Sequence, residues 1–285
     1  MQNLLQTNKP LAKILLKAQE EVFNARVGEN TTQKKGFGYD FMQLREYQNG
    51  EDVKHIDWTI SAKLNKPYVK LFHEQKELHI VIVPLLSASV CFGVKVIKQD
   101  VIAEICALLA FSSIQQNDTF SSYITNDRTL LCTQRDKSFY NVRTLVQTTL
   151  EYKTLQKGMN YKRLCKTLYT QESQKSLLFL VGDFFHTNSF NLTALALKHE
   201  LIVIIVRDRF EEQPDTLGEL HLTDPLSNKK SFIHLNTKTR TKIKRKVTQE
   251  DAVFIDKLKR AEVRFIKVYT DENPVSKILA LMGDL

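Results

Sequence analysis

The order of apolar and polar residues changes in character near residue 78. From there to the end of the chain, continuous apolar runs alternate with segments whose apolar residues recur at helical spacing. A short apolar run without alternation is typical of a strand that is buried on both faces of a sheet. Runs of this kind predict strands at 78–86, 177–181, 201–207 and 263–269.

Helical spacing and turn residues predict the elements between these strands. Two shorter strands are predicted at 119–125 and 129–133, and a polar hairpin at 219–222 and 230–235. Helices are predicted at 95–115, 138–152, 161–171, 189–199, 237–260 and 273–282. Buried strands that alternate with helices form a mostly parallel sheet with right-handed connections. We therefore expect residues 78–285 to form a doubly wound, Rossmann-like α/β domain.

Residues 1–77 do not follow this alternation. An amphipathic helix is expected from about 11 to 25, and the chain after it is polar and rich in turn residues. Glycine-containing turns at 36–38 and 48–50 precede short aromatic and β-branched pieces at 56–60 and 68–72. This pattern indicates an N-terminal helix followed by a small β-rich subdomain with hairpins.

Composition places the chain among ordinary globular proteins. Hydrophobic residues make up 42% and charged residues 26%, which is far from the composition of a disordered chain. The four cysteines include no Cys-x-x-Cys pair, which favours free thiols in a reducing compartment over disulfides or zinc. No apolar run approaches the roughly 20 residues that cross a bilayer, and the N-terminus has no signal-peptide cleavage pattern. We therefore expect a cytoplasmic protein without a transmembrane segment.

The net charge of +9 favours acidic partners, nucleic acid among them. The basic residues are scattered except for a cluster at Lys238–Lys246, whose spacing suits the solvated face of a helix. No aromatic residues interleave with these charges to stack on bases. We therefore keep nucleic-acid binding only as an alternative.

Candidate chemistry lies where two predicted strands end. Ser87 and Ser89 follow the strand at 78–86, and Asp183 follows the strand at 177–181. Ligands of doubly wound sheets bind at the carboxyl ends of the strands. Hydroxyls and a carboxylate could bind magnesium there, although the same residues are also common helix caps and turn residues. Leu85 stands where such a site would need a further carboxylate.

The motifs of common enzyme classes are missing from the sequence. There is no Gly-x-Ser-x-Gly elbow, no Gly-x-x-x-x-Gly-Lys-(Ser/Thr) phosphate loop and no histidine pair at metal-ligand spacing. His186, three residues after Asp183, is the histidine closest to the predicted site in the sequence. A lone histidine after a strand is more often a solvated loop residue than a general base. We therefore predict no catalytic residue and no enzymatic activity.

A longer pattern lies in the N-terminal part, in the stretch GFGYDFMQLREYQNGEDVKHIDWTISAKLNKPYVKLF, residues 36–72. Through it the chain resembles the bacterial family catalogued as domain of unknown function fifty-eight, whose C-terminal part is similar to a von Willebrand factor A domain. The positions that match the family pattern are Gly36, Gly38, Asp40, Phe41, Leu44, Arg45, Tyr47, Gly50, Glu51, Asp52, Lys54, Ile56, Asp57, Trp58, Ser61, Ala62 and Lys63. The resemblance continues in order through the later strands and covers nearly the whole chain.

This resemblance implies a von Willebrand factor A-like fold with a metal-ion-dependent adhesion site. Such a site holds magnesium with an Asp-x-Ser-x-Ser loop, a threonine of a second loop and an aspartate of a third. Ser87 and Ser89 match the first loop, Asp183 matches the third, and Asn160 stands at the threonine position. Leu85 replaces the first aspartate, and an isobutyl group cannot bind a cation. The resemblance thus implies a degenerate site, and we expect no metal or other cofactor.

Five residues of the matched stretch are singled out as a family signature and a possible partner surface: Arg45, Tyr47, Asp52, Asp57 and Trp58. The aromatic residues are expected chiefly to form a small core that docks the segment on the sheet. The charged residues could lock the hairpins or face a partner, and both interpretations stay open.

These features together predict a non-enzymatic protein-interaction domain. The resemblance implies an adaptor that acts beside a MoxR-type AAA+ ATPase and other von Willebrand factor A-like proteins in protein assembly or maturation. The expected mode is docking of a partner's acidic group at Ser87, Ser89 and Asp183 without a bridging metal. Metal-dependent adhesion at a preserved site and nucleic-acid binding through Lys238–Lys246 are the alternatives.

Overall fold

The computed structural model describes residues 2–29, 41–48, 50–72, 77–214 and 218–283. Contacts divide the chain into two compact units. The larger unit comprises Met1–Arg26 together with Leu78–Leu285, and the smaller unit comprises Val27–Glu77. Each unit is considered by itself.

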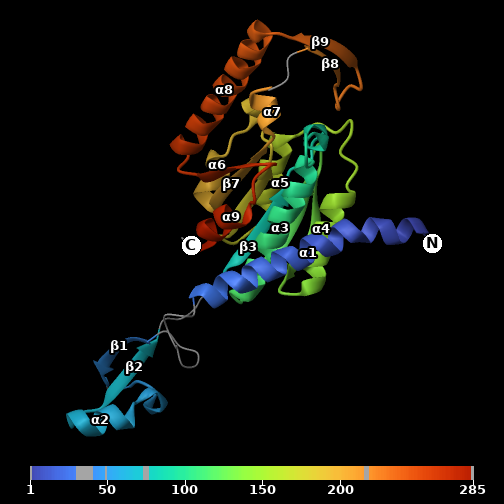
Figure 1. Cartoon of the computed structure of the whole chain (residues 1–285). Coiled ribbons are helices and arrows are strands. Elements are labelled where there is room, and N and C mark those ends of the chain that lie inside the picture. Colours follow the sequence, from blue (N-terminus) through green and yellow to red (C-terminus); the bar gives the residue numbers. More distant parts are fainter. Residues whose placement is uncertain (1, 30–40, 49, 73–76, 215–217, 284–285) are drawn as a thin grey trace. The chain divides into compact units, whose positions relative to one another are not determined.

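The larger unit is built on a six-stranded sheet with the order β10-β7-β6-β3-β4-β5 (Figure 1). Its strands are β3 (His79–Pro84), β4 (Thr119–Thr125), β5 (Thr129–Asp136), β6 (Leu177–Gly182), β7 (Glu200–Arg207) and β10 (Arg264–Tyr269). All neighbouring strands pair in parallel except β4 and β5, which are antiparallel. The prediction of a mostly parallel sheet is confirmed. Strand order reverses between the neighbours β3 and β6, which is where doubly wound sheets bind ligands.

Helices cover both faces of this sheet. One face packs against α3 (Lys98–Gln115), α4 (Phe139–Glu151) and α9 (Val275–Gly283), the other against α5 (Tyr161–Gln171), α6 (Thr193–Lys198) and α8 (Thr237–Arg260). The central strand β3 shows why its apolar run is continuous. Ile80 and Ile82 belong to the core on the α3 side, whereas Val81 and Val83 belong to the core on the α5 side.

The N-terminal helix α1 (Gln2–Glu29) belongs to the larger unit as far as Arg26. The sequence grouped this helix with the segment that follows it, in a domain of residues 1–77, and the structure differs. Four apolar residues of one helical face, Leu11, Leu15, Ala18 and Val22, are buried in the same core as α3 and α4. The helix lies across α3 and α4 (Figure 1), because burying this apolar stripe removes it from water.

The C-terminal part of the larger unit adds α7 (Arg209–Glu212) and a hairpin of β8 (Gly218–Thr223) and β9 (Lys230–Leu235) before α8. In α8 only Phe254 and Leu258 are buried, and the lysines of the 238–246 cluster are exposed, as predicted for a solvated helix face. Among the described residues, no helix combines the length and the apolar character that a membrane crossing requires.

The smaller unit contains a two-stranded antiparallel sheet and two short helices. Strand β1 (Phe41–Glu46) pairs with β2 (Tyr68–Phe72), and between them lie the 3₁₀ helix η1 (Val53–His55) and α2 (Trp58–Leu64). The aromatic and β-branched piece at 56–60 was expected in a β-rich subdomain, but only Ile56 pairs as a β-bridge and a helix begins at Trp58. The Asp57 carboxylate accepts hydrogen bonds from the backbone N–H groups of Thr59 and Ile60, both at 3.0 Å. This N-cap starts a helix and overrides the β preference of the local residues. The predicted turn at Gly36–Gly38 lies outside the described residues.

Candidate functional site

The two predicted loops meet at the carboxyl ends of β3 and β6. Ser87 follows β3 and begins the 3₁₀ helix η2 (Ala88–Cys91), and Asp183 directly follows Gly182, the last residue of β6. The Ser87 and Ser89 hydroxyl oxygens lie 2.8 Å apart. The Ser89 hydroxyl helps to lower the pKa of the Asp183 carboxyl group. Three of the residues predicted from the sequence thus come together at the point where the strand order reverses.

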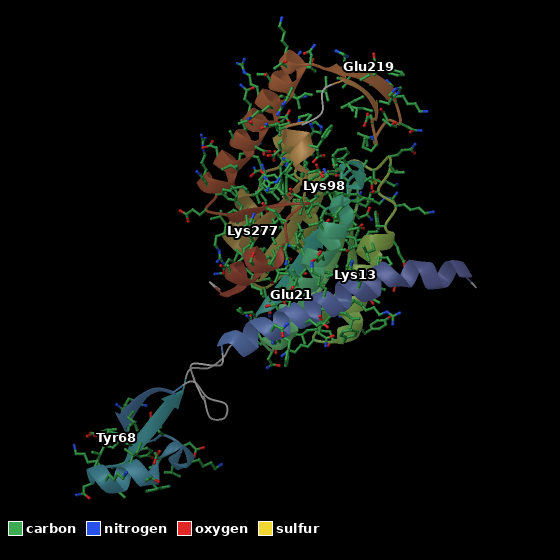
Figure 2. All side chains as sticks on the ribbon, in the orientation of Figure 1. Lys13, Glu21, Tyr68, Lys98, Glu219 and Lys277 are labelled. Carbon is green, nitrogen blue, oxygen red and sulfur yellow. The ribbon has the colours of Figure 1, made fainter. Side chains whose placement is uncertain are left out.

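A fourth residue, which the sequence reasoning missed, occupies the centre of this cluster. Lys98 is the first residue of α3, and its side chain is completely buried (Figure 2). Its ammonium nitrogen lies 3.0 Å from Asp183 Oδ2 and 2.7 Å from Glu211 Oε1. A cation at a helix N-terminus faces the positive end of the helix dipole, so the two carboxylates must offset that repulsion. A lysine at a helix start, where acidic residues are usual, is the signal that could have identified it.

The pKa values of Asp183 and Glu211 shift in opposite directions in this environment. Burial would raise the pKa of Asp183, but the Lys98 ammonium, the Ser89 hydroxyl and the Arg207 guanidinium together hold that pKa below its ordinary value. For Glu211, burial outweighs Lys98 and raises the pKa. A capping box with Asp208 fixes the position of Glu211 at the start of α7. Both carboxylates hydrogen-bond the Lys98 ammonium, and Asp183 is the more deeply buried of the two.

Leu85, where the resemblance implies a missing carboxylate, lies just after β3. It is buried, and its backbone N–H donates to the Val181 carbonyl at 2.7 Å. Its Cβ lies only 2.7 Å from where a Cβ on Gly182 would be placed, so the close approach of the two loops requires glycine at 182. The leucine packs where β3 and β6 run side by side, and it donates no ligand to the cluster.

Asn160, the residue of the second predicted loop, forms a local helix cap. Its side chain is the N-cap of α5 and accepts a hydrogen bond from the Arg163 backbone N–H at 2.9 Å. Within the described ranges, no hydrogen bond connects this side chain with Ser87, Ser89 or Asp183. Nor does the described part of the chain contain a group of three or more His, Cys, Asp or Glu side chains arranged to hold a metal ion.

The signature residues of the smaller unit serve chiefly local structure. Arg45 forms an ion pair with Glu51, and the Tyr47 hydroxyl donates to the Glu51 carbonyl at 2.9 Å. Asp52 caps η1 and Asp57 caps α2. These charged residues thus stabilise local structure, which is one of the two roles that the sequence left open for them.

Trp58 does not take the place that the sequence assigned to it. It is the first residue of α2 and is 68% exposed, so Trp58 is not part of a core formed within the smaller unit. Among the residues of this unit whose burial is described, Ile56 and Val69 are the buried apolar ones, and they pair across an isolated bridge. A tryptophan with this exposure buries little apolar surface in the chain as it stands, and such residues are frequent at protein interfaces.

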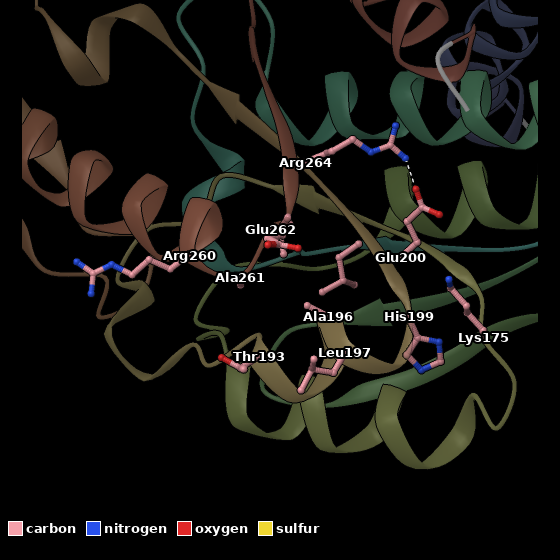
Figure 3. Close-up of a pocket in the computed structure, with 12 residues that line it drawn as sticks. Lys175, Thr193, Ala196, Leu197, His199, Glu200, Arg260, Ala261, Glu262 and Arg264 are labelled. Carbon is pink, nitrogen blue, oxygen red and sulfur yellow. Dashed lines mark hydrogen bonds and ion pairs between the residues drawn. The ribbon is translucent and has the colours of Figure 1, made fainter.

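A cavity of about 520 Å³ lies at the amino-terminal ends of the strands, where β7 and β10 begin (Figure 3). Arg264 and Glu200 form an ion pair between these strands beside it. His199, which also lines the cavity, is buried, and its Nδ1 accepts a hydrogen bond from the Ser176 backbone N–H at 3.3 Å. Its Nε2 is buried without a hydrogen-bond partner in the described structure. Burial, with Lys198 nearby, lowers the pKa of His199 below its ordinary value.

Acidification from about pH 7.5 to about pH 5.5 is expected to lower the free energy of unfolding through His199. Because its pKa is lowered in the folded state, the unfolded chain binds the proton more readily below about pH 6.5, and stability falls as the pH falls through that value. His199→Asn keeps an acceptor for the Ser176 N–H and does not titrate, so urea unfolding should show a shallower loss. His234→Asn, at an exposed position, should follow the wild type. Equal pH dependence in wild type and His199→Asn would contradict the prediction.

The fold defines an α/β protein with a candidate site at the switch point of its sheet. Residues 43–253 match the family model described as protein of unknown function DUF58, and the chain belongs to this family. The uncharacterized proteins Rv1480 of Mycobacterium tuberculosis and Mb1516 of Mycobacterium bovis are each 25% identical to it over 195 residues. The matched part is 66% of this chain and 61% of each relative, so the chain spans less than two thirds of their length.

Solved structures show weaker likeness. BatB from Bacteroides thetaiotaomicron is 11% identical, with a TM-score of 0.43 over 73% of this chain and 100% of that one. An aerotolerance-related membrane protein from Bacteroides fragilis is 12% identical, with a TM-score of 0.46 over 72% of this chain and 97% of that one.

Proposed function

We propose that the chain is a non-enzymatic protein-interaction domain that acts with a MoxR-type AAA+ ATPase in the assembly or maturation of other proteins. The ATPase enters through the family resemblance. The mode of interaction rests on one observation, the Lys98 ammonium buried between Asp183 and Glu211 at the end of the sheet. The proposal is that partners dock at this end of the sheet without a bridging metal ion.

The chemistry of the cluster supports a degenerate adhesion-type site. In an adhesion-type site, a divalent cation lies among first-loop hydroxyls and a third-loop aspartate. Here the Lys98 ammonium hydrogen-bonds the corresponding aspartate, Asp183, and Leu85 offers no ligand. A covalently attached cation neutralises the aspartate at all times and has no open coordination position for a partner's carboxylate. An acidic group of a partner would therefore bind a different cation at the carboxyl ends of the strands.

The smaller unit supports a second contact. Trp58 is exposed on α2, and exposed Val53 and Leu64 occur in the same unit. The local caps hold η1 and α2 in place without help from Trp58, so the indole ring is available to a partner. Tryptophan is over-represented among residues that dominate binding energy at interfaces. We assign this surface to the ATPase, because it lies within the stretch that carries the family pattern.

Co-purification tests this proposal with the full-length protein as bait and the MoxR-type ATPase of the same bacterium as prey. Trp58→Ala is expected to reduce the recovered ATPase at least tenfold, because interface tryptophans often contribute about 2 kcal/mol or more. Tyr140→Ala removes an aromatic side chain that is 73% exposed on α4 and should behave like the wild type. Failure of the wild-type bait to retain the ATPase would refute the proposal.

A further inference from the structure

A buried arginine with unused hydrogen-bond donors lies beside the Lys98 cluster. Arg207 is the last residue of β7 and is 1% exposed. Its Nη2 donates to Asp251 Oδ1 at 2.6 Å, while Nε and Nη1 are buried without a hydrogen-bond partner among the described residues. Leaving buried N–H donors of a charged group unsatisfied is unfavourable, so such a group in a folded protein calls for an explanation.

An aromatic ring covers this guanidinium. Arg207 Cζ lies 3.6 Å from the centroid of the Phe185 ring, close enough for a cation–π interaction that offsets part of the lost hydration. Phe185 lies between Phe184 and His186, whose φ angles of 50° and 55° are in the left-handed region. Non-glycine residues are uncommon there, and such strain concentrates at ligand-binding segments. The ring that covers Arg207 therefore belongs to a segment with two left-handed non-glycine residues, and the Tyr161 hydroxyl donates to the Phe185 backbone carbonyl at 3.1 Å.

A pocket of about 170 Å³ lies next to the covered guanidinium, between the loop after β6 and α8. Phe184, Phe185 and Val253 provide apolar walls, and Thr187 and Gln249 are among its polar lining. This size suits one side chain, with its methylene groups against the walls and a polar tip toward Arg207. Glu250 also lines the pocket, and Lys246 on the preceding turn of α8 lies 3.9 Å from its carboxylate.

The carboxylates nearest to Arg207 are also held by lysines. Asp251, its single hydrogen-bond partner, is shared with Lys267, whose ammonium lies 2.7 Å from Asp251 Oδ2. Asp183 hydrogen-bonds Lys98. Lys98 also pairs with Glu211 and Lys267 also pairs with Glu212, so carboxylates already balance the charges around Arg207. What remains unused are the Nε and Nη1 donors of the guanidinium, which have no hydrogen-bond partner among the described residues.

We propose that this pocket binds the carboxylate of an acidic side chain from a protein partner, with Arg207 as the receiving cation once Phe185 moves aside. Arginine suits this task because its planar guanidinium donates several charge-assisted hydrogen bonds to one carboxylate. The proposal deepens the proposed function and rests on it. In place of a metal ion, the Arg207 guanidinium at the carboxyl end of β7 binds the acidic group of the partner. The occupant is an acidic peptide segment.

Binding of two short peptides to the full-length protein tests this inference. The probes are acetyl-Ala-Glu-Ala-amide and its neutral counterpart acetyl-Ala-Gln-Ala-amide, titrated by NMR or calorimetry at low salt. The glutamate peptide should bind the wild type at least about tenfold more tightly than the glutamine peptide. Arg207→Lys, which keeps the charge and the partner of Asp251, should abolish that difference. Phe185→Ala, which removes the covering ring, should tighten glutamate binding severalfold.

Each outcome bears on the pocket separately from the proposed ATPase partnership. Equal binding of the two peptides, or glutamate binding that survives Arg207→Lys, would overturn the inference. So would failure of the glutamate peptide to bind both the wild type and Phe185→Ala. None of these results requires the ATPase, so the co-purification could succeed while the pocket inference fails. Equally, a peptide that binds through Arg207 would support the pocket even if no ATPase were retained.

Discussion

Replacing Lys98 with methionine is expected to lower the free energy of unfolding by about 3–5 kcal/mol, because it leaves Asp183 as a buried carboxylate without its cation. Methionine keeps most of the volume of the lysine stem, so loss of packing contributes little to the change. Chemical denaturation at neutral pH, followed by far-UV circular dichroism, measures the effect. Arg260→Met is the matched control, since Arg260 forms an exposed pair with Asp256 that should contribute no more than about 0.5 kcal/mol.

The pH dependence of the Lys98→Met variant identifies the group responsible. Wild-type Asp183 has a lowered pKa, so its contribution is present above the unfolded value of about 3.9 and is lost as the pH falls through the folded value. Without Lys98, burial raises the pKa, and Asp183 should protonate at a milder pH. The gap between wild type and variant should therefore narrow toward pH 4. Adding Asp183→Asn should recover part of the stability at neutral pH, because the unpaired charge is then gone. A Lys98→Met variant as stable as Arg260→Met would show that the pair is not a stabilising element.

A magnesium site is expected to appear only when two residues are changed together. Leu85→Asp introduces the missing carboxylate, and Lys98→Ser removes the ammonium that hydrogen-bonds Asp183. The double variant should gain about 2–3 kcal/mol of stability when magnesium is present at roughly 100 times its dissociation constant. The Leu85→Asp variant should show no magnesium response, because the Lys98 ammonium still occupies the place beside Asp183. Thermal unfolding of each variant with and without magnesium, compared with calcium and with chelator, measures the difference.

The same titration separates the proposed mode of docking from metal-dependent adhesion. A rise in the unfolding temperature of the wild type across millimolar magnesium would favour the adhesion alternative and contradict a cluster neutralised by Lys98. A response in Leu85→Asp alone would show that the ammonium does not block cation binding. Absence of a response in the double variant would show that these loops do not have adhesion-site geometry.

Much of the fold follows from the periodicity of the sequence. The predicted bounds of α8, 237–260, agree with the structure, and the apolar runs at β3, β6 and β7 are the buried strands. A strand buried on both faces needs apolar residues at every position, and a helix on a sheet needs one apolar stripe. These requirements depend on the local sequence, so the strands and helices can be predicted without knowing which elements pack against them. Ser87, Ser89 and Asp183 were predicted on the same basis, because parallel strands end at one edge of the sheet.

What the sequence could not determine is which distant residues meet at that edge. Lys98 is 85 residues from Asp183 and 113 residues from Glu211, and periodicity says only that it belongs to the helix predicted at 95–115. Its ammonium reaches the cluster because α3 packs on the sheet beside β3. Arg207 likewise looks like the last residue of an apolar strand, and only the packing of the loop after β6 covers it with Phe185. The sequence by itself therefore determined the strands and helices of the larger unit. It also determined that the candidate site lies at the carboxyl ends of the strands. The tertiary structure decided the charges within it, because side-chain partners far apart in the chain are set by packing and not by local pattern.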